Sequence, residues 1–420
     1  MDDRGEIAYR RRLVDPLLDE LTEQLPGLMI TGPRASGKTT TVERRVATVV
    51  RLDQPVESAA FRIDPDAALK RLREPVLLDE WQAVPEVFGA ARRAIDERYA
   101  PGRFYLTGSV TAEHRFSVYP GTGRIQRIAM YPMSVAEQSG KVNADTFLDR
   151  VGRGESIHSP AEAPDLPGYI DLALKGGFPV PALCLSGHAR ENWLEDYVDA
   201  LLTKDLVQLD GEGPGRHRDT RKLRRFFEAW VLNTSGIIDQ RRIHEAASVS
   251  KQTGESYERL LSRLMVVDHV PAWRSNRLKR LTGQPKRYVI DPSLVAASLR
   301  MDTLAVMADG NMIARILDTF VAAQLRPELA VAKSRPRLYH LRTKGGRQEI
   351  DLLVELAGEK LIGIEVKASA APDRSDARHL AWLRDEVGDR FIAGIVFHTG
   401  PRPYQLDKKI TAVPIASIWA

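Results

Sequence analysis

The 420-residue sequence has almost no cysteine, since Cys184 is its only one. A single cysteine rules out an intramolecular disulfide and a cysteine-based metal site, which fits a protein of the reducing cytoplasm. No run of roughly 18 or more apolar residues is present, so we expect no membrane span. The N-terminal residues MDDRGEIAYRRR are charged and lack an apolar core, so we expect no signal peptide.

Size and composition are those of an ordinary globular protein. A chain of this length is typical of about three domains. The apolar share of 43% suffices for globular cores, and the charged share of 28% is near average. The net charge of +5 permits contact with nucleic acid without requiring it.

A phosphate-binding loop stands near the N-terminus. Residues 32–39, GPRASGKT, match the pattern G-x-x-x-x-G-K-[ST], and an apolar run that can form a buried strand precedes them. Backbone N–H groups of such a loop, with the positive end of the following helix, cradle nucleotide phosphates. Lys38 would reach the outer phosphates and Thr39 would hold Mg²⁺. The predicted nucleotide-binding residues are Gly32, Pro33, Arg34, Ala35, Ser36, Gly37, Lys38, Thr39 and Thr40.

An acidic pair follows the loop by about 40 residues. Val76 to Leu78 can form a strand, and Asp79 and Glu80 come directly after it. An acid at a strand end can bind Mg²⁺, directly or through water, and we assign this to Asp79 with Thr39. Glu80 would activate the water that attacks the γ-phosphate.

Two further positions are candidates for action on the γ-phosphate. The next strand ends in Thr107, Gly108 and Ser109, and the hydroxyl of Thr107 or Ser109 could sense the γ-phosphate. We prefer Ser109 for this role. The alternative is that Ser109 only caps a turn. Arg124 or Arg127 could stabilise the transferring group, in cis or from a neighbouring subunit, with Arg124 preferred; the alternative is a solvated strand-end arginine. Strands that alternate with helical crossovers predict a parallel sheet covered on both faces.

The middle of the chain is predicted to be helical. Residues 141–168 are rich in Gly, Pro and Ser and read as a linker. Within 169–300, three helical segments and two strands predict a winged helix-turn-helix. The leading end of its third helix would carry Lys251, Gln252, Thr253 and Tyr257. The wing would carry Arg274, Arg277, Lys279, Arg280, Lys286 and Arg287. Such cations give sequence-blind affinity for DNA, although winged-helix folds also serve as protein-interaction spacers.

The last segment, 301–420, is predicted to be α/β. Asp351 on one strand, followed after a hairpin by Glu365, Val366 and Lys367, resembles the core of PD-(D/E)xK nucleases. Alternation places Glu365 and Lys367 on one face, where the two carboxylates could hold Mg²⁺ and Lys367 could position the attacking water. Asp318, on a preceding helix, would add a carboxylate where the family more often has Glu. The alternative is a nuclease-like fold kept as a scaffold.

The motifs together resemble one protein family. GPRASGKTT, LLDEWQAVPEVF, YLTGS and GRIQRIAMYPMSVAE, followed by GGFP, WLEDYVDALLTKDL, EIDLLVE and IGIEVKAS, occur in the order typical of AAA+-related P-loop ATPases (AAA_14 type) with a DUF4143 C-terminal region. The resemblance implies ATP and Mg²⁺ as ligands and often a homo-oligomer. We therefore predict an ATPase domain over 1–140, a linker over 141–168, a winged-helix region over 169–300 and a nuclease-like domain over 301–420.

Three functions are compatible with this pattern. The first is an ATPase that couples hydrolysis to DNA or to a partner. The second is an ATP-gated, metal-dependent nuclease that uses Asp351, Glu365 and Lys367. The third is a nucleotide-dependent protein-binding switch without significant catalysis, which we rank last because Glu80 stands where a hydrolytic base is needed.

Overall fold

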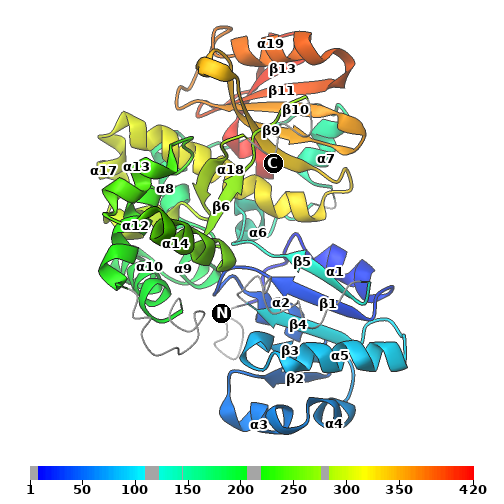
Figure 1. Cartoon of the computed structure of the whole chain (residues 1–420). Helices are drawn as coiled ribbons and strands as arrows, with labels where there is room; N and C mark the ends of the chain where they lie inside the picture. The colour runs from blue at the N-terminus through cyan, green and yellow to red at the C-terminus, as the bar shows by residue number, and fades with distance from the viewer. Residues whose placement is uncertain (1–7, 109–122, 144, 206–218, 276–282) are drawn as a thin grey trace. The chain divides into compact units, whose positions relative to one another are not determined.

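A computed structural model describes residues 8–108, 123–143, 145–205, 219–275 and 283–420 (Figure 1). It divides into two compact units. Unit 1 comprises Met1–Pro132 with Arg263–Met265, and unit 2 comprises Met133–Ser262 with Val266–Ala420. The predicted winged-helix region and the predicted C-terminal domain therefore belong to one compact unit instead of two.

Unit 1 is built on a parallel five-stranded sheet with the order β2-β3-β4-β1-β5. Its strands are β1 (Gly27–Thr31), β2 (Thr48–Arg51), β3 (Val76–Asp79), β4 (Phe104–Gly108) and β5 (Ile125–Ala129). Its helices are α1 (Asp15–Thr22), α2 (Lys38–Glu43), α3 (Pro55–Ile63), α4 (Pro65–Lys70), α5 (Glu86–Glu97) and the 3-10 turn η1 (Trp81–Ala83). The parallel sheet confirms the predicted α/β class of this unit.

Burial on both faces explains why the central strands are continuous apolar runs. All residues of β1, β3 and β4 are buried. One set of alternate side chains, with Met29, Leu78 and Leu106 among them, packs against the apolar face of α5. Helix α1 begins at Asp15, because Pro16 lies in its first turn, where the fixed φ of proline suits the start of a helix.

The N-terminal part of unit 2 is helical. Its helices are α6 (Val135–Ser139), α7 (Phe147–Gly152), α8 (Leu166–Lys175), α9 (Pro179–Leu183), α10 (Gly187–Ala200), the π-helical turn η2 (Leu201–Asp205), α12 (Thr220–Leu232), α13 (Gln240–Ala246), α14 (Lys251–Arg263), α16 (Ser293–Leu299), α17 (Thr303–Met307) and α18 (Gly310–Val331). Strands β6 (Val267–Val270) and β7 (Lys286–Val289) form an antiparallel pair after α14. The elements α12, α13, α14, β6 and β7 thus follow the predicted order of three helices and two strands.

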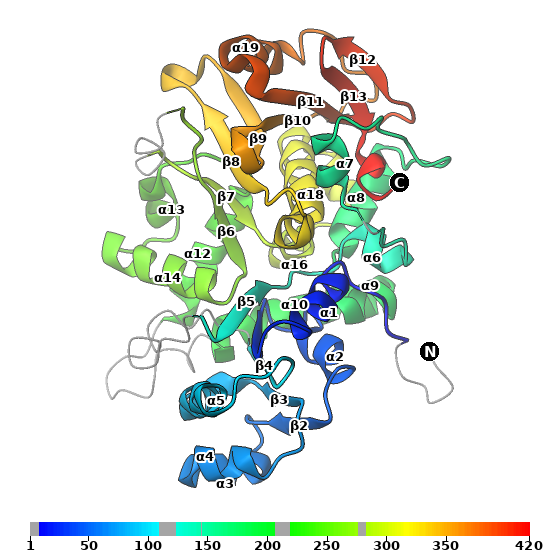
Figure 2. The same ribbon diagram turned by 90° about the vertical axis from the view of Figure 1, so that its right-hand side faces the viewer.

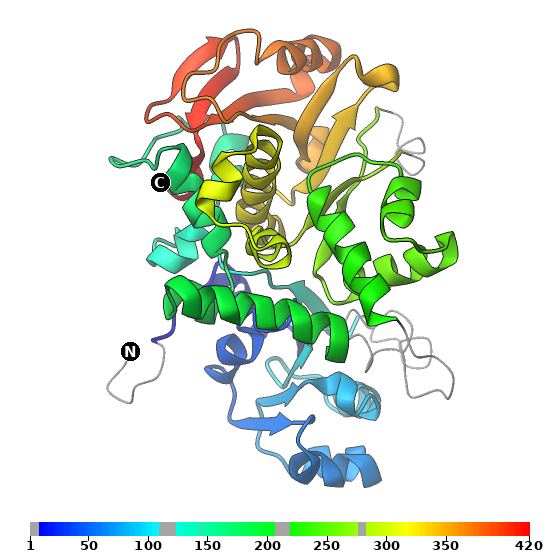
Figure 3. The ribbon, with the colours of Figure 1, turned by 90° about the vertical axis from the view of Figure 1, so that its left-hand side faces the viewer.

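The C-terminal part of unit 2 is a mixed six-stranded sheet with the order β12-β13-β11-β10-β9-β8. Its elements are β8 (Arg337–Arg342), β9 (Glu349–Glu355), β10 (Leu361–Val366), α19 (Arg378–Val387), β11 (Phe391–His398), β12 (Tyr404–Asp407), β13 (Ile410–Pro414) and the 3-10 turns η3 (Lys344–Gly346), η4 (Ala357–Glu359), η5 (Gly388–Arg390) and η6 (Ile415–Trp419). Helices α18 and α7 lie on one face of this sheet and α19 lies on the other (Figures 2 and 3).

The predicted linker 141–168 contains a buried helix, which corrects the prediction for that part. Phe147, Leu148 and Val151 of α7 are buried, and the ring of Phe147 lies 5.8 Å from that of Phe397 on β11. The carboxylate of Glu328 on α18 accepts hydrogen bonds from the backbone N–H groups of Phe147 and Leu148. The surrounding glycine and proline residues led to the prediction of a linker, whereas tertiary contacts stabilise a short apolar helix here.

No helix in the described parts of the chain is long and apolar enough to cross a membrane.

Candidate functional site

The phosphate-binding loop joins β1 to α2 at the carboxyl end of the sheet (Figure 1). Ala35 and Gly37 have φ angles of 58° and 91°, and such left-handed residues turn successive backbone N–H groups toward one concavity. Gly32 is required because a Cβ there would lie 2.1 Å from the carbonyl oxygen of Met130. The Ser36 hydroxyl is buried and has no hydrogen-bond partner in the described structure, so the loop holds a polar group that a ligand can satisfy.

Lys38 is buried across this loop. Its Nζ donates hydrogen bonds to the carbonyl oxygens of Gly32, at 3.1 Å, and Pro33, at 2.8 Å. Burial lowers the pKa of Lys38 to about 8, although the charges of Glu80 and Asp79 oppose that shift. The ammonium is therefore already inside the loop and can exchange two neutral acceptors for phosphate oxygens.

The predicted magnesium ligands meet at one point. The Thr39 hydroxyl donates a hydrogen bond of 2.8 Å to Oδ1 of Asp79, although β1 and β3 are separated by β4. The buried Thr107 hydroxyl, at the end of β4, donates to the same Asp79 oxygen. A hydroxyl and a carboxylate are hard oxygen ligands of the kind that Mg²⁺ prefers, so these residues fit the ion.

Glu80 lies next to this point in a left-handed backbone conformation with φ of 50°. Burial raises the pKa of its carboxyl group above the ordinary value, while the charge of Lys38 and a hydrogen bond from the Gln82 amide oppose that shift. A carboxylate with a raised pKa is a better proton acceptor near neutral pH. Glu80 is thus suited to the role of general base, and Gln82 holds its side chain.

Arg12 is a buried residue of the site that sequence reasoning missed. Its guanidinium donates hydrogen bonds of 2.8 Å to the carbonyl oxygens of Ser36, in the loop, and Tyr131, after β5. Its backbone N–H donates to the carboxylate of Asp15 at 2.7 Å. Arg12 therefore braces the loop against the end of β5. It lies in the run Arg10 to Arg12, where nothing in the sequence distinguishes it from its neighbours.

The two γ-phosphate candidates fare differently. Ser109 lies outside the described residues, whereas Thr107 reaches Asp79. Arg124 precedes β5 at its amino end, opposite the end that carries the loop, and its Nε lies 2.9 Å from Oδ1 of Asp96. A role for Arg124 in cis is therefore wrong, because the length of β5 separates it from the loop. A role from a neighbouring subunit stays a prediction.

The predicted DNA-binding residues are only partly on the surface. Lys251, Gln252 and Arg274 are exposed. Tyr257 is buried against Phe226, with ring centroids 5.6 Å apart, so it is not available to a groove.

Two of the expected wing cations also point inward, so the prediction that they contact DNA is wrong. Lys286 and Arg287 are each 3% exposed. The guanidinium of Arg287 lies over the Trp230 ring and donates to the carbonyl oxygen of Ile238. Arg277, Lys279 and Arg280 lie outside the described residues.

The four nuclease-like residues do converge. Asp318 on α18, Asp351 on β9 and Glu365 on β10 lie close enough that the charge of Asp351 acts on both other carboxylates, and Nζ of Lys367 lies 3.1 Å from Oε2 of Glu365. Sequence reasoning missed that Lys286 of β7 also enters this centre and pairs with Asp318 and Asp351. In the described parts of the chain, no group of three or more His, Cys, Asp or Glu side chains is arranged to hold a metal ion.

The charges in this centre perturb one another. Burial lowers the pKa of Lys286, but the charges of Asp318 and Asp351 outweigh burial and hold that pKa well above its ordinary value. Burial raises the pKa of Asp318 to about 6, against the opposing charge of Lys286. Burial, together with the nearby charge of Asp351, holds the pKa of Glu365 well above its ordinary value.

Models of three protein families match parts of this chain, and one of them covers the sheet of unit 1. The model of a family described as AAA domain matches residues 25–139. Models of two families described as domains of unknown function match residues 166–305 (DUF8612) and residues 314–418 (DUF4143). Two uncharacterised proteins, of Mycobacterium bovis and Mycobacterium tuberculosis, are each 25% identical over 98% of this chain and 85% of their own length. Among solved structures, a Walker-type ATPase of Pyrococcus abyssi matches 68% of this chain and 94% of its own with a TM-score of 0.40 and 14% identity.

Proposed function

We propose that this chain, which joins an AAA-related P-loop ATPase domain to a DUF4143 C-terminal region, binds ATP with Mg²⁺ and hydrolyses it. The observation that carries the proposal is the 2.8 Å contact between the Thr39 hydroxyl and Asp79, because it joins the loop to the acidic strand end. One ion can contact both groups there. Lys38 would bind the outer phosphates, and Glu80 would take a proton from the attacking water.

The bound Mg²⁺ would neutralise charge on the β- and γ-phosphates. The protein's own contribution is positioning. Arg12 holds the loop through the Ser36 carbonyl, and Thr107 orients Asp79 through a hydrogen bond. Gln82 holds the Glu80 carboxylate. These contacts place charged and polar groups before the nucleotide arrives, which reduces the reorganisation that hydrolysis needs.

Steady-state hydrolysis of ATP by the full chain, with and without Glu80→Gln, tests the proposal. We expect the variant to keep the ATP affinity of the parent and to lose about 10²–10⁴-fold in kcat, the contribution typical of a general base. Glu86→Gln is the matched control, because Glu86 is an exposed carboxylate six residues further along the chain. Equal kcat values for the parent and Glu80→Gln would refute the role of Glu80.

We also propose that hydrolysis is coupled to DNA or to a protein partner, and that the chain acts as a homo-oligomer. Support for DNA comes from the exposed Lys251 and Gln252 at the start of α14 and from exposed Arg274. These few groups predict weak binding that salt abolishes. Hydrolysis rates with and without duplex DNA at low salt, run beside a sizing column, test both ideas. An unchanged rate with no DNA retention would favour a protein partner.

A further inference from the structure

The nuclease-like centre of unit 2 already contains a cation. Lys286 enters it from β7, and its side chain is only 4% exposed. Alternation along β7 puts Lys286 and Tyr288 on one side of the strand, and both reach the carboxylate of Asp318 on α18. Strand pairing and the hydrogen bonds of the centre thus fix the ammonium among the carboxylates.

The donors of this ammonium are all engaged. Nζ of Lys286 contacts Oδ2 of Asp318, Oδ1 of Asp351 at 3.1 Å and the carbonyl oxygen of Asp351 at 3.3 Å. An ammonium group has three N–H donors, so these three acceptors match its capacity. The ammonium of Lys286 is therefore fully coordinated by protein oxygens, and it has no N–H donor left for solvent.

The carboxylate oxygens are engaged as well. The other oxygen of Asp318 accepts a hydrogen bond of 2.9 Å from the Tyr288 hydroxyl, and the other oxygen of Asp351 accepts one of 3.1 Å from the backbone N–H of Val366. Oε2 of Glu365 pairs with Lys367 at 3.1 Å. Of the six carboxylate oxygens of Asp318, Asp351 and Glu365, only Oε1 of Glu365 lacks a hydrogen-bond partner in the described structure.

We infer that the Lys286 ammonium takes the place of the divalent metal in this centre, so that the DUF4143 region of this chain does not cut nucleic acid through Asp318, Asp351 and Glu365. Mg²⁺ would have to lie about 2.0–2.1 Å from the same oxygens. It would then stand beside the ammonium, and the two cations would repel each other strongly in a buried site. The ion pairs join β7 to α18 and β9, which makes the centre a structural junction.

The charge balance of the centre supports this assignment. Asp318 and Asp351 face the two ammonium groups of Lys286 and Lys367, while the raised pKa of Glu365 favours its neutral form. Removing the charge of Lys286 would leave one carboxylate charge unbalanced. A divalent ion bound with Glu365 ionised would then restore neutrality, because three carboxylates would face Lys367 and the ion. The inference does not depend on ATP hydrolysis, since every residue it uses lies in unit 2.

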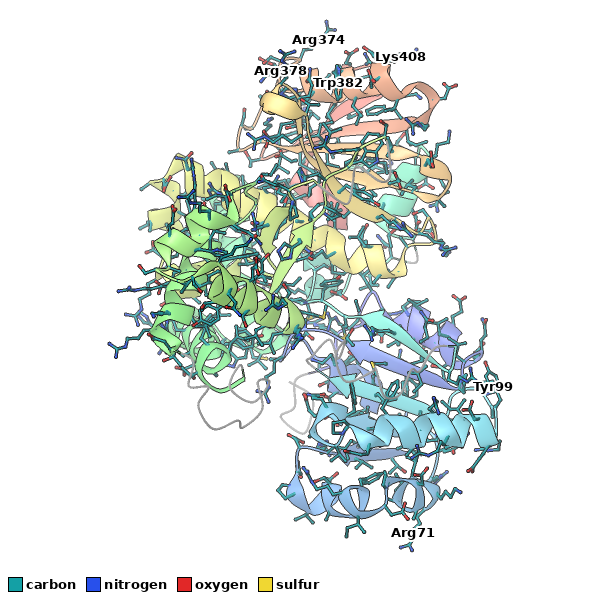
Figure 4. The ribbon with its side chains drawn as sticks, in the orientation of Figure 1. Arg71, Tyr99, Arg374, Arg378, Trp382 and Lys408 are labelled. Atoms are coloured by element: carbon teal, nitrogen blue, oxygen red, sulfur yellow. The ribbon has the colours of Figure 1, made fainter. Side chains whose placement is uncertain are left out.

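Binding of Mn²⁺ to the nucleotide-free full chain, followed by electron paramagnetic resonance, tests the inference. We expect the parent and Asp351→Asn to bind Mn²⁺ equally, because the centre of the parent holds none. Lys286→Met keeps the length of the side chain without its charge, and it should gain one site at least tenfold tighter than any in the parent. Mn²⁺ should also raise the melting temperature of that variant. Lys408→Met, on the exposed surface in Figure 4, is the control that should gain nothing.

Two results would overturn the inference. The first is that the parent binds Mn²⁺, or cuts DNA with Mn²⁺, and that Asp351→Asn abolishes this activity. The second is a folded Lys286→Met variant that gains no Mn²⁺ site, because the centre would then have no need of a cation. If Lys286→Met fails to fold, the comparison of the parent with Asp351→Asn decides alone: binding lost with Asp351 refutes the inference, and the absence of such binding supports it.

Discussion

The buried ammonium of Lys38 predicts that ATP affinity falls as the pH rises. Burial lowers the pKa of Lys38 to about 8, so the free protein loses this charge within an accessible pH range. ATP is an anion and binds the protonated form. If the bound lysine stays protonated, the apparent Kd rises by roughly 25-fold between about pH 7.5 and 9.5, which is close to 1.9 kcal/mol.

Calorimetric titration of ATP at constant ionic strength over this range measures the effect. The slope approaches tenfold per pH unit well above the pKa, because one proton is involved. Lys38→Arg keeps a positive charge throughout the range, so whatever affinity it retains should not vary with pH. A flat profile for the parent, or an equal slope in Lys38→Arg, would refute the assignment of this proton to Lys38.

Three further results are expected. Arg12→Lys keeps the charge but cannot make the two hydrogen bonds of the guanidinium, so we expect about tenfold weaker ATP binding with an unchanged circular dichroism spectrum; unchanged affinity would argue against a brace. Gln82→Ala removes a hydrogen bond that lowers the pKa of Glu80, so the acidic limb of the kcat profile should move to higher pH; a limb that stays in place would separate Gln82 from Glu80. Phe147→Ala should lower the free energy of unfolding of unit 2 by about 3–5 kcal/mol in urea titrations, because it leaves a cavity beside Phe397; a loss below about 1 kcal/mol would contradict the packing of α7.

The nucleotide site was largely predictable from the sequence because its chemistry is local. The loop, its lysine and the acidic pair each follow an apolar strand, and the carboxyl ends of parallel strands meet at one edge of a sheet. The contact between Thr39 and Asp79 confirms that expectation. The proximity of Asp351 and Glu365 likewise agrees with the expectation from alternation and a hairpin, whereas Asp318, on helix α18, was added only from the resemblance to nucleases.

The parts that the sequence did not predict depend on tertiary partners. Arg12 and Lys286 both stand in basic runs, where solvated side chains are the usual outcome. Their burial depends on acceptors more than 20 residues away, namely the Ser36 carbonyl for Arg12 and Asp318 for Lys286. Arg124 was misplaced for a different reason: it precedes its strand, and a parallel sheet puts the amino ends of its strands opposite the loop, a rule that the prediction did not apply to Arg124.

Calorimetric binding of ATP with Mg²⁺ to the parent and to Lys38→Ala tests the central claim most directly. Lys70→Ala is the matched control, because Lys70 is an exposed lysine of the same unit that pairs with Glu97. The site described here predicts one nucleotide per chain in the parent and in Lys70→Ala, and none in Lys38→Ala. Undiminished ATP binding by Lys38→Ala would contradict it.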